Sequence, residues 1–334
     1  MRGKKVIIIN KEGKSASSAV AAGIYNPFNF RRAIPTWEAE RTCNDTEDFY
    51  SKAEQITGGE FLKHKKIYRV FPDAAERMLW EKNVEQKEML FAEKEILENP
   101  FPDKVHSPFG VGVLNGGGVV NTGAFLFSVK EYFSSRNEYL DEWFDHEKLE
   151  IFPDKLIYDQ SITADKIIFC EGHLATMNGL FADVHLAPTK GEVIHVSIPN
   201  LNLTEILHGP VYLAPLGNDL YVCGATFDPG KSDEKITEAA CEELLAKLKS
   251  MISLPVRSES QFAGVRPAGK DRKAMVGLHD QHKNIAIFNG AGGRGVLLSP
   301  FFAQLLADHM ESGVPLPLEI DFARFSMPKS ASGR

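Results

Sequence analysis

A strand, a glycine-rich loop and a helix follow one another near the end of this 334-residue chain. The apolar run 285–288 predicts a buried strand, and the pattern over 296–310 predicts a helix. The loop between them reads Asn-Gly-Ala-Gly-Gly-Arg-Gly, from Asn289 to Gly295. Because glycine has no Cβ, a ligand can approach this backbone closely, and the next helix offers free N–H groups to an anionic or electron-rich group. Glycine loops also end helices and form plain turns, so the loop alone leaves a cofactor site and a simple turn both open.

The composition is that of a globular protein, with 43% hydrophobic and 25% charged residues. A chain of this length forms one large or two moderate domains. The net charge of −7 lacks the basic excess with which a nucleic-acid-binding surface neutralises phosphates. No apolar run approaches the roughly 18 residues of a membrane-spanning helix. We therefore expect a protein that binds no nucleic acid and has no membrane-spanning segment.

The cysteines form no C-x-x-C pair and share no zinc-type spacing with the histidines. They are Cys43, Cys170, Cys223 and Cys241. Cys170 and Cys223 lie in apolar, strand-like runs, where a buried free thiol is the usual form. The sequence therefore predicts no metal site and a reducing, cytoplasmic location.

Apolar runs at 5–10, 166–170 and 285–288 are typical of fully buried strands in a parallel sheet. Strand patterns of the antiparallel type cluster at 66–120 and 193–226. The expected fold class is α/β with mixed α+β character. A nucleotide-type domain is assembled from discontinuous pieces, and a domain built on an antiparallel sheet is interleaved with it.

Two local patterns lead to more detailed predictions. Asn115 to Gly118 predicts a hairpin turn that joins two strands within 111–120. Residues 74–97 carry helical periodicity and many charges, which predicts a solvated surface helix.

Five segments spread over nearly the whole chain occur in the order typical of one enzyme family. They are the strand 4–10, the small-residue segment 15–27, Ile168-Phe169-Cys170-Glu171-Gly172, Gly264-Val265-Arg266-Pro267 with Asp271, and Gly290 to Gly295 followed by Leu298-Ser299-Pro300. In these segments the chain resembles the D-amino-acid-oxidase-like family of FAD-dependent oxidoreductases. The resemblance implies a discontinuous Rossmann-like FAD-binding domain (1–60, 150–190 and 255–334) and a substrate domain (61–149 and 191–254).

The resemblance also implies which residues contact the cofactor. They are Asn10, Ser17, Ser18, Ala22, Gly23, Gly290, Gly292, Gly293, Arg294 and Gly295. Some family members attach the flavin to a cysteine near the arginine motif, but residues 262–269 contain none. We therefore expect non-covalent FAD.

The chain departs from the family pattern at its N-terminal end. The family places a strand, a G-x-G-x-x-G loop and a helix before the strand found here at 5–10, which implies an N-terminally incomplete Rossmann-like domain. Either the start site is misplaced or the chain is a remnant. Without that first strand two neighbouring strands lose a ladder partner, and the helix end that receives the pyrophosphate is missing. Asn10 also replaces the usual acidic residue; it can accept a ribose hydrogen bond but carries no charge, or it simply begins a turn.

Two residues are the predicted substrate contacts. In the family the arginine equivalent to Arg266 often pairs with the substrate carboxylate, which a planar guanidinium holds by two hydrogen bonds. The alternative is a structural arginine tied to Asp271 or to local carbonyls. The second predicted contact is Tyr212, in a strand of the implied substrate domain. Tyr221, in the next strand, is the alternative, and buried packing is the commoner fate of tyrosine.

The resemblance implies oxidation of the C–N bond of an amino acid or secondary amine by hydride transfer to flavin. The substrate is then a small amine or amino acid, and the electron acceptor is oxygen or a quinone-linked carrier. Two alternatives remain open. One is a truncated, non-catalytic remnant or weak nucleotide-binding protein, and the other is a flavoenzyme of the same fold that acts on a modified base or a hydroxy acid.

Overall fold

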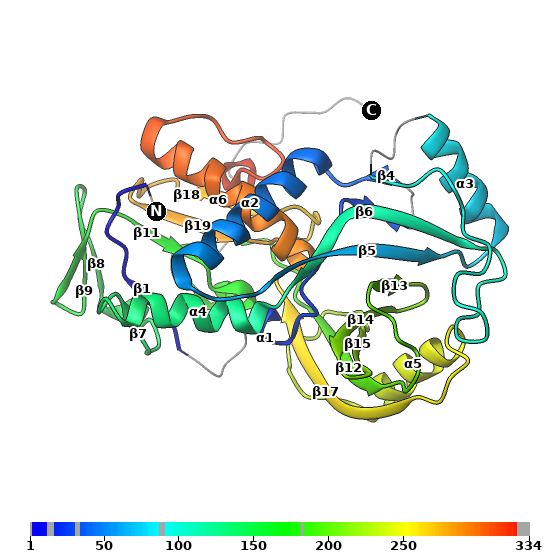
Figure 1. Cartoon of the computed structure of the whole chain (residues 1–334). Coiled ribbons are helices and arrows are strands. Elements are labelled where there is room, and N and C mark those ends of the chain that lie inside the picture. The colour runs from blue at the N-terminus through cyan, green and yellow to red at the C-terminus, as the bar shows by residue number, and fades with distance from the viewer. Residues whose placement is uncertain (1, 12–16, 31–33, 87–90, 182–183, 326–334) are drawn as a thin grey trace.

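The largest element is a nine-stranded sheet that occupies the right-hand half of the molecule in Figure 1. The computed structural model describes residues 2–11, 17–30, 34–86, 91–181 and 184–325. The spatial order is β16 (Asp228–Pro229), β12 (Thr189–Ser197), β15 (Leu220–Gly224), β14 (Tyr212–Gly217), β13 (Ile206–His208), β5 (Leu62–Val70), β6 (Val111–Val120) and β2 (Ile24–Tyr25), with β17 (Arg257–Arg266) paired to β12. All pairings are antiparallel except β13 with β5.

The two faces of this sheet have different coverings. Helix α5 (Glu238–Lys249) begins at its N-cap Thr237 and contributes Leu244 and Leu248 to a core that includes Ile194 and Val196 of β12. Because side chains alternate along a strand, Gly191 and Val193 lie on the opposite face. That opposite face carries the candidate site described below.

A second group of strands forms two smaller sheets. In one, β11 (Ile167–Phe169) pairs in parallel with β19 (Ile285–Asn289), which pairs antiparallel with β18 (Met275–Leu278). In the other, β1 (Ile8–Ile9) pairs in parallel with β7 (Tyr139–Leu140). The mixed α/β fold class predicted from the sequence is confirmed.

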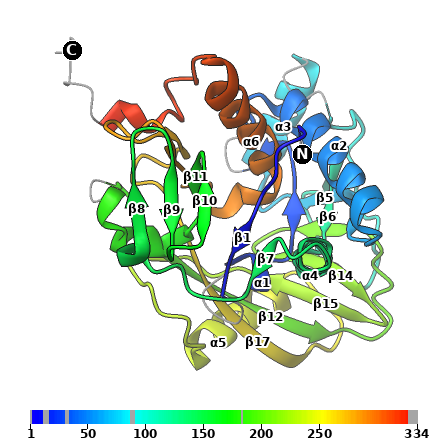
Figure 2. The same cartoon turned by 90° about the vertical axis from the view of Figure 1, so that its left-hand side faces the viewer.

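The strands β1 and β11 belong to separate sheets (Figure 2). Among the described residues, no strand is hydrogen-bonded between them. Val6 and Ile7 are 38% and 41% exposed, and Ile168 of β11 is 45% exposed. The prediction of fully buried strands at 5–10 and 166–170 is therefore wrong: β1 spans only Ile8–Ile9, both partly exposed, and within β11 only Phe169 is buried.

One long helix holds the start of the C-terminal helix in place. Helix α2 (Ala39–Thr57) packs along α6 (Gly295–Ser312). The Thr46 hydroxyl donates to the Leu297 carbonyl at 2.7 Å, and the Tyr50 hydroxyl donates to the Val296 carbonyl at 3.4 Å. The first turn of α6, directly after the glycine loop, is therefore anchored through its backbone.

The remaining elements are short or lie at the surface. They are α1 (Ser17–Val20), α3 (Ala74–Glu85), α4 (Thr122–Ser134), β3 (Phe28–Asn29), β4 (Ile34–Pro35), β8 (Leu149–Ile151), β9 (Leu156–Tyr158), β10 (Ile162–Ala164), and the 3₁₀ turns η2 (His146–Lys148), η3 (Gly172–Met177), η4 (Gly179–Phe181), η5 (Gly292–Arg294) and η6 (Phe322–Phe325).

Two local predictions are wrong. Residues 111–120 form the single strand β6 rather than a hairpin. Its glycines relieve crowding instead of forming a turn: a Cβ on Gly116 would lie 2.5 Å from the Phe91 ring, and one on Gly118 would overlap the Lys63 carbonyl oxygen. The helix predicted over 74–97 ends at Glu85.

Candidate active site

The glycine loop lies where the sequence predicts it, between the end of β19 and the start of α6. Gly290 and Gly292 have φ angles of 78° and 57°, which favour glycine. A Cβ on Gly290 would also lie 3.0 Å from the Met275 backbone nitrogen. The Asn289 side chain donates to the Gly172 carbonyl at 2.7 Å and accepts from the Gly290 N–H at 2.8 Å. The start of the loop is therefore fixed to β18 and to η3, just beyond β11.

The other two glycines are not required by packing. A Cβ on Gly293 would meet nothing closer than 3.6 Å, and one on Gly295 nothing closer than 3.9 Å. Gly293 is exposed, as is the neighbouring Arg294, whose pKa is lowered by desolvation. This part of the backbone is therefore open to a ligand, and a side chain at Gly293 or Gly295 would occupy the space over it.

Arg266 lies against this open backbone. Its Cδ is 3.6 Å from the position that a Cβ on Gly293 would take. Its Nη1 donates to the Thr226 carbonyl at 3.3 Å, and no carboxylate in the described part of the chain forms an ion pair with it. Asp271, the alternative partner, is paired with Arg324 at 3.0 Å instead. Burial lowers the Arg266 pKa, but a guanidinium keeps its charge in proteins.

Tyr212 lies beside Arg266 on the same face of the sheet. It is paired with Gly224 of β15, and a Cβ on Gly224 would lie 2.6 Å from its hydroxyl oxygen. Burial raises the Tyr212 pKa, and the nearby Arg266 charge lowers it by less. The phenol is therefore neutral and can donate a hydrogen bond. Tyr221 differs, because it is in the core and its hydroxyl accepts from the Leu203 N–H at 3.2 Å.

The small-residue segment reaches the same region. Helix α1 packs on β17, and a Cβ on Gly264 would lie 2.6 Å from Val20 and 3.3 Å from the Ser17 Cα. Ser18 is exposed, and Ala22 is half-buried. Gly23 has φ 68°, and a Cβ there would overlap the Val120 carbonyl, so that glycine is required by the fold itself.

The remaining two residues are Asn10, a predicted cofactor contact, and Cys170, a predicted buried thiol. Asn10 follows β1, and its side-chain amide donates to the Tyr139 hydroxyl at 2.8 Å. It thus lies on the β1–β7 sheet, which is separate from the sheet that ends in the glycine loop. Cys170 is exposed, so the expectation of a buried thiol is wrong for this residue, whereas Cys223 is buried as expected.

The sequence interpretation missed Gly191 and Thr226, which both touch Arg266. A signal for Gly191 exists, since an isolated glycine inside a strand pattern often marks a close approach by another group. Thr226 carries no such signal, because its contact with Arg266 is made by a backbone carbonyl.

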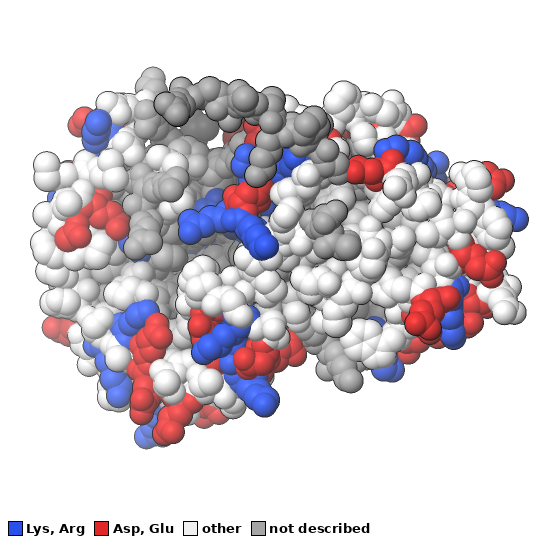
Figure 3. Space-filling view, turned by 180° about the vertical axis from the view of Figure 1, so that it is seen from behind, with Lys and Arg blue, Asp and Glu red and all other residues white. Residues whose placement is uncertain are grey.

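The surface charges are mixed. Acidic and basic side chains alternate on the face shown in Figure 3. The described residues include no group of three or more histidine, cysteine or acidic side chains placed to hold a metal ion. No described helix has the length and apolar character needed to cross a membrane.

Comparisons with known proteins agree on one family. A family model described as FAD dependent oxidoreductase matches residues 1–309. The glycine oxidase of Bacillus licheniformis is 32% identical over 140 residues, which are 41% of this chain and 38% of that protein. The tRNA 5-methylaminomethyl-2-thiouridine biosynthesis bifunctional protein of Hahella chejuensis is 31% identical over 160 residues, 44% of this chain and 25% of that protein. The matches therefore span less than half of these relatives.

A solved structure extends the similarity over the whole fold. The glycine oxidase of Bacillus cereus aligns with a TM-score of 0.77 and 22% identity, over 94% of this chain and 90% of that one. At this identity the likeness concerns the fold.

Proposed function

Because the chain belongs to the family of FAD-dependent oxidoreductases, whose cofactor is FAD, we propose that it oxidises the C–N bond of a small carboxylated amine. Such substrates are amino acids and N-substituted amino acids. The observation that carries the proposal is Arg266, a half-buried cation without a carboxylate partner among the described residues, held against the open backbone of the glycine loop. Glycine oxidases, by their name, act on a substrate of this class.

The glycine loop fits the cofactor. Gly293 and Gly295 leave their backbone uncovered, and the first turn of α6 directs free N–H groups and a positive dipole end towards the space above them. We assign Gly290, Gly292, Gly293, Arg294 and Gly295 to the flavin, with Ser17, Ser18, Ala22 and Gly23 beside it and Asn10 to the adenosine part. When bound, FAD accepts a hydride and its electron pair from the substrate. The linkage is non-covalent, as is typical of the family.

Arg266 and Tyr212 orient the substrate. The guanidinium binds the substrate carboxylate through two parallel N–H donors. The neutral Tyr212 hydroxyl donates a further hydrogen bond from the same face of the sheet. Fixing the carboxylate fixes the carbon beside the amine relative to the glycine loop, which lowers the barrier through orientation. No acid or base is assigned, because a neutral amine can lose hydride without one.

The finer assignments are part of this proposal. Residues 1–60, 150–190 and 255–334 hold the cofactor, and 61–149 with 191–254 hold the substrate. The cytoplasmic location and the absence of a nucleic-acid partner stay predictions. A modified-base substrate is the second candidate, supported by the relative whose name concerns tRNA biosynthesis, but an arginine without a carboxylate partner favours a carboxylated substrate.

Steady-state kinetics of Arg266→Ala test the proposal. With FAD-loaded protein and a panel of amino acids, sarcosine and amines without a carboxylate, we expect kcat/KM on the carboxylated substrates to fall about 100-fold or more. Arg257→Ala is the matched control, since Arg257 is the exposed first residue of the same strand. Equal loss on substrates with and without a carboxylate, or unchanged kcat/KM, would remove Arg266 from substrate binding.

A further inference from the structure

The Arg266 guanidinium lies directly on Gly191. A Cβ on Gly191 would overlap the guanidinium carbon and both terminal nitrogens of Arg266. Gly191 is buried in the interior of β12, opposite Gly264 of β17. Glycine usually weakens a strand interior, because it loses more conformational entropy on folding than other residues and has no side chain to pack. Here the guanidinium fills the space that a side chain at position 191 would occupy.

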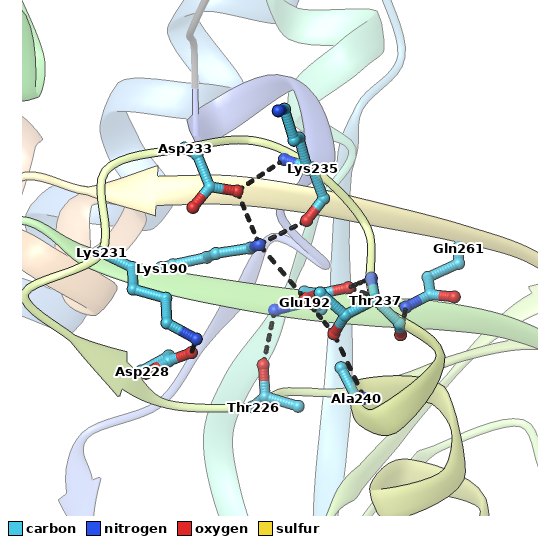
Figure 4. A network of polar contacts seen from close by, with 10 residues as sticks. All are labelled: Lys190, Glu192, Thr226, Asp228, Lys231, Asp233, Lys235, Thr237, Ala240 and Gln261. Atoms are coloured by element: carbon cyan, nitrogen blue, oxygen red, sulfur yellow. Dashed lines mark hydrogen bonds and ion pairs between the residues drawn. The ribbon is translucent and has the colours of Figure 1, made fainter.

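The two neighbours of Gly191 act on the other face of the sheet (Figure 4). Lys190 is 2% exposed and donates to the Asp233 carboxylate at 2.9 Å. The Glu192 carboxylate accepts from the Thr237 N–H and hydroxyl, both at 2.9 Å, and from the Gln261 amide at 2.7 Å. These contacts fasten the segment 226–237 to β12.

The fastened segment supplies the hydrogen-bond partner of Arg266. The Thr226 N–H donates to the Glu192 carbonyl at 3.0 Å, and the Glu192 N–H donates to the Thr226 hydroxyl at 2.8 Å. This reciprocal pair fixes the Thr226 carbonyl, which accepts from Arg266 Nη1 at 3.3 Å. Arginine has five N–H donors, so most of the guanidinium donors are left for another acceptor.

We propose that Gly191 is a positioning residue that sets the depth at which Arg266 binds the substrate carboxylate. The segment Lys190-Gly191-Glu192 forms a seat: Gly191 lets the guanidinium lie flat on the sheet, and Glu192 fixes its lateral position through Thr226. The inference rests on the carboxylate-binding role proposed above for Arg266. Gly191 thus influences substrate binding through Arg266, without touching the substrate itself.

Gly191→Ala tests the seat, with Gly179→Ala as the matched control because a Cβ on Gly179 meets nothing within 4 Å. Two readouts use FAD-loaded protein: calorimetric titration with acetate against acetamide, and the rate at which phenylglyoxal modifies Arg266, followed by peptide mass spectrometry. The overlap is relieved when the flexible guanidinium moves, so we expect Gly191→Ala to fold. We expect its acetate affinity to fall about 10- to 100-fold, the worth of a charge-assisted contact. The modification rate of Arg266 should change several-fold, and Gly179→Ala should match the wild type in both readouts.

The two readouts separate the inference from the proposed function. An altered modification rate in Gly191→Ala supports the seat even if the wild type binds no acetate, and in that case the carboxylate role fails. An unchanged modification rate together with unchanged acetate affinity overturns the seat. A change of equal size in Gly179→Ala overturns it as well.

Discussion

At the scale of single residues, the glycines of one loop have different tasks. Gly290 has a left-handed φ and lies against β18, whereas Gly293 has space around its Cβ position. The sequence predicts the cluster and its place between strand and helix. It cannot tell the two kinds of glycine apart, because the crowding of Gly290 comes from Lys273 and Met275, whose position depends on the pairing of β18 with β19.

Alanine substitutions within this loop distinguish the two tasks. Gly290→Ala should lower the free energy of unfolding of the FAD-free protein by about 1–3 kcal/mol, because it adds left-handed strain and crowding. Gly293→Ala should change it by less than about 0.5 kcal/mol, yet weaken FAD binding about 10-fold or more by occupying the space over the loop. Urea unfolding and FAD titration measure the two quantities. A Gly293→Ala protein with wild-type FAD affinity would contradict the assignment of this backbone to the cofactor.

At the scale of elements, strand β12 separates two functions on its two faces. On one face, the Arg266 guanidinium lies on Gly191. On the other face, hydrogen bonds of Lys190 and Glu192 hold the segment 226–237 against the strand. The strand patterns of the sequence begin at residue 193, whereas β12 begins at Thr189 in the structure. The burial of Lys190 was not predictable, since Asp233, which accepts its hydrogen bond, lies 43 residues further along the chain.

Loss of the buried Lys190 charge should lower the free energy of unfolding more than loss of a surface lysine charge. Burial lowers the Lys190 pKa, but hydrogen bonding to Asp233 and the charges of Glu192 and Asp233 outweigh it, and the net pKa is raised. Lys190→Met should lower the free energy of unfolding by about 2 kcal/mol, because Glu192 stays buried without its cation while Asp233 can turn to water. Lys247→Met removes an exposed pair with Glu243 and should cost about 0.3–0.5 kcal/mol. Similar urea midpoints for the two variants would show that the fastening of 226–237 does not depend on Lys190.

At the scale of the whole molecule, segments far apart in the sequence meet at one place. Helix α1 packs on the Gly264-to-Arg266 end of β17, Arg266 lies against the glycine loop, and that loop is hydrogen-bonded to Gly172 after β11. Their order along the chain was enough to predict the family. Their geometry was not, because it depends on long-range strand pairing, and Asn10 lies on a separate two-stranded sheet that the sequence did not predict.

A crystal structure of the FAD-loaded protein with acetate tests the central claim most directly. We expect the flavin ring against the backbone of Gly293 and Gly295, and the acetate carboxylate on two N–H groups of Arg266, with the guanidinium still lying on Gly191. A flavin bound away from this loop, or an Arg266 turned to an acidic side chain of the protein while acetate binds elsewhere, would contradict the account.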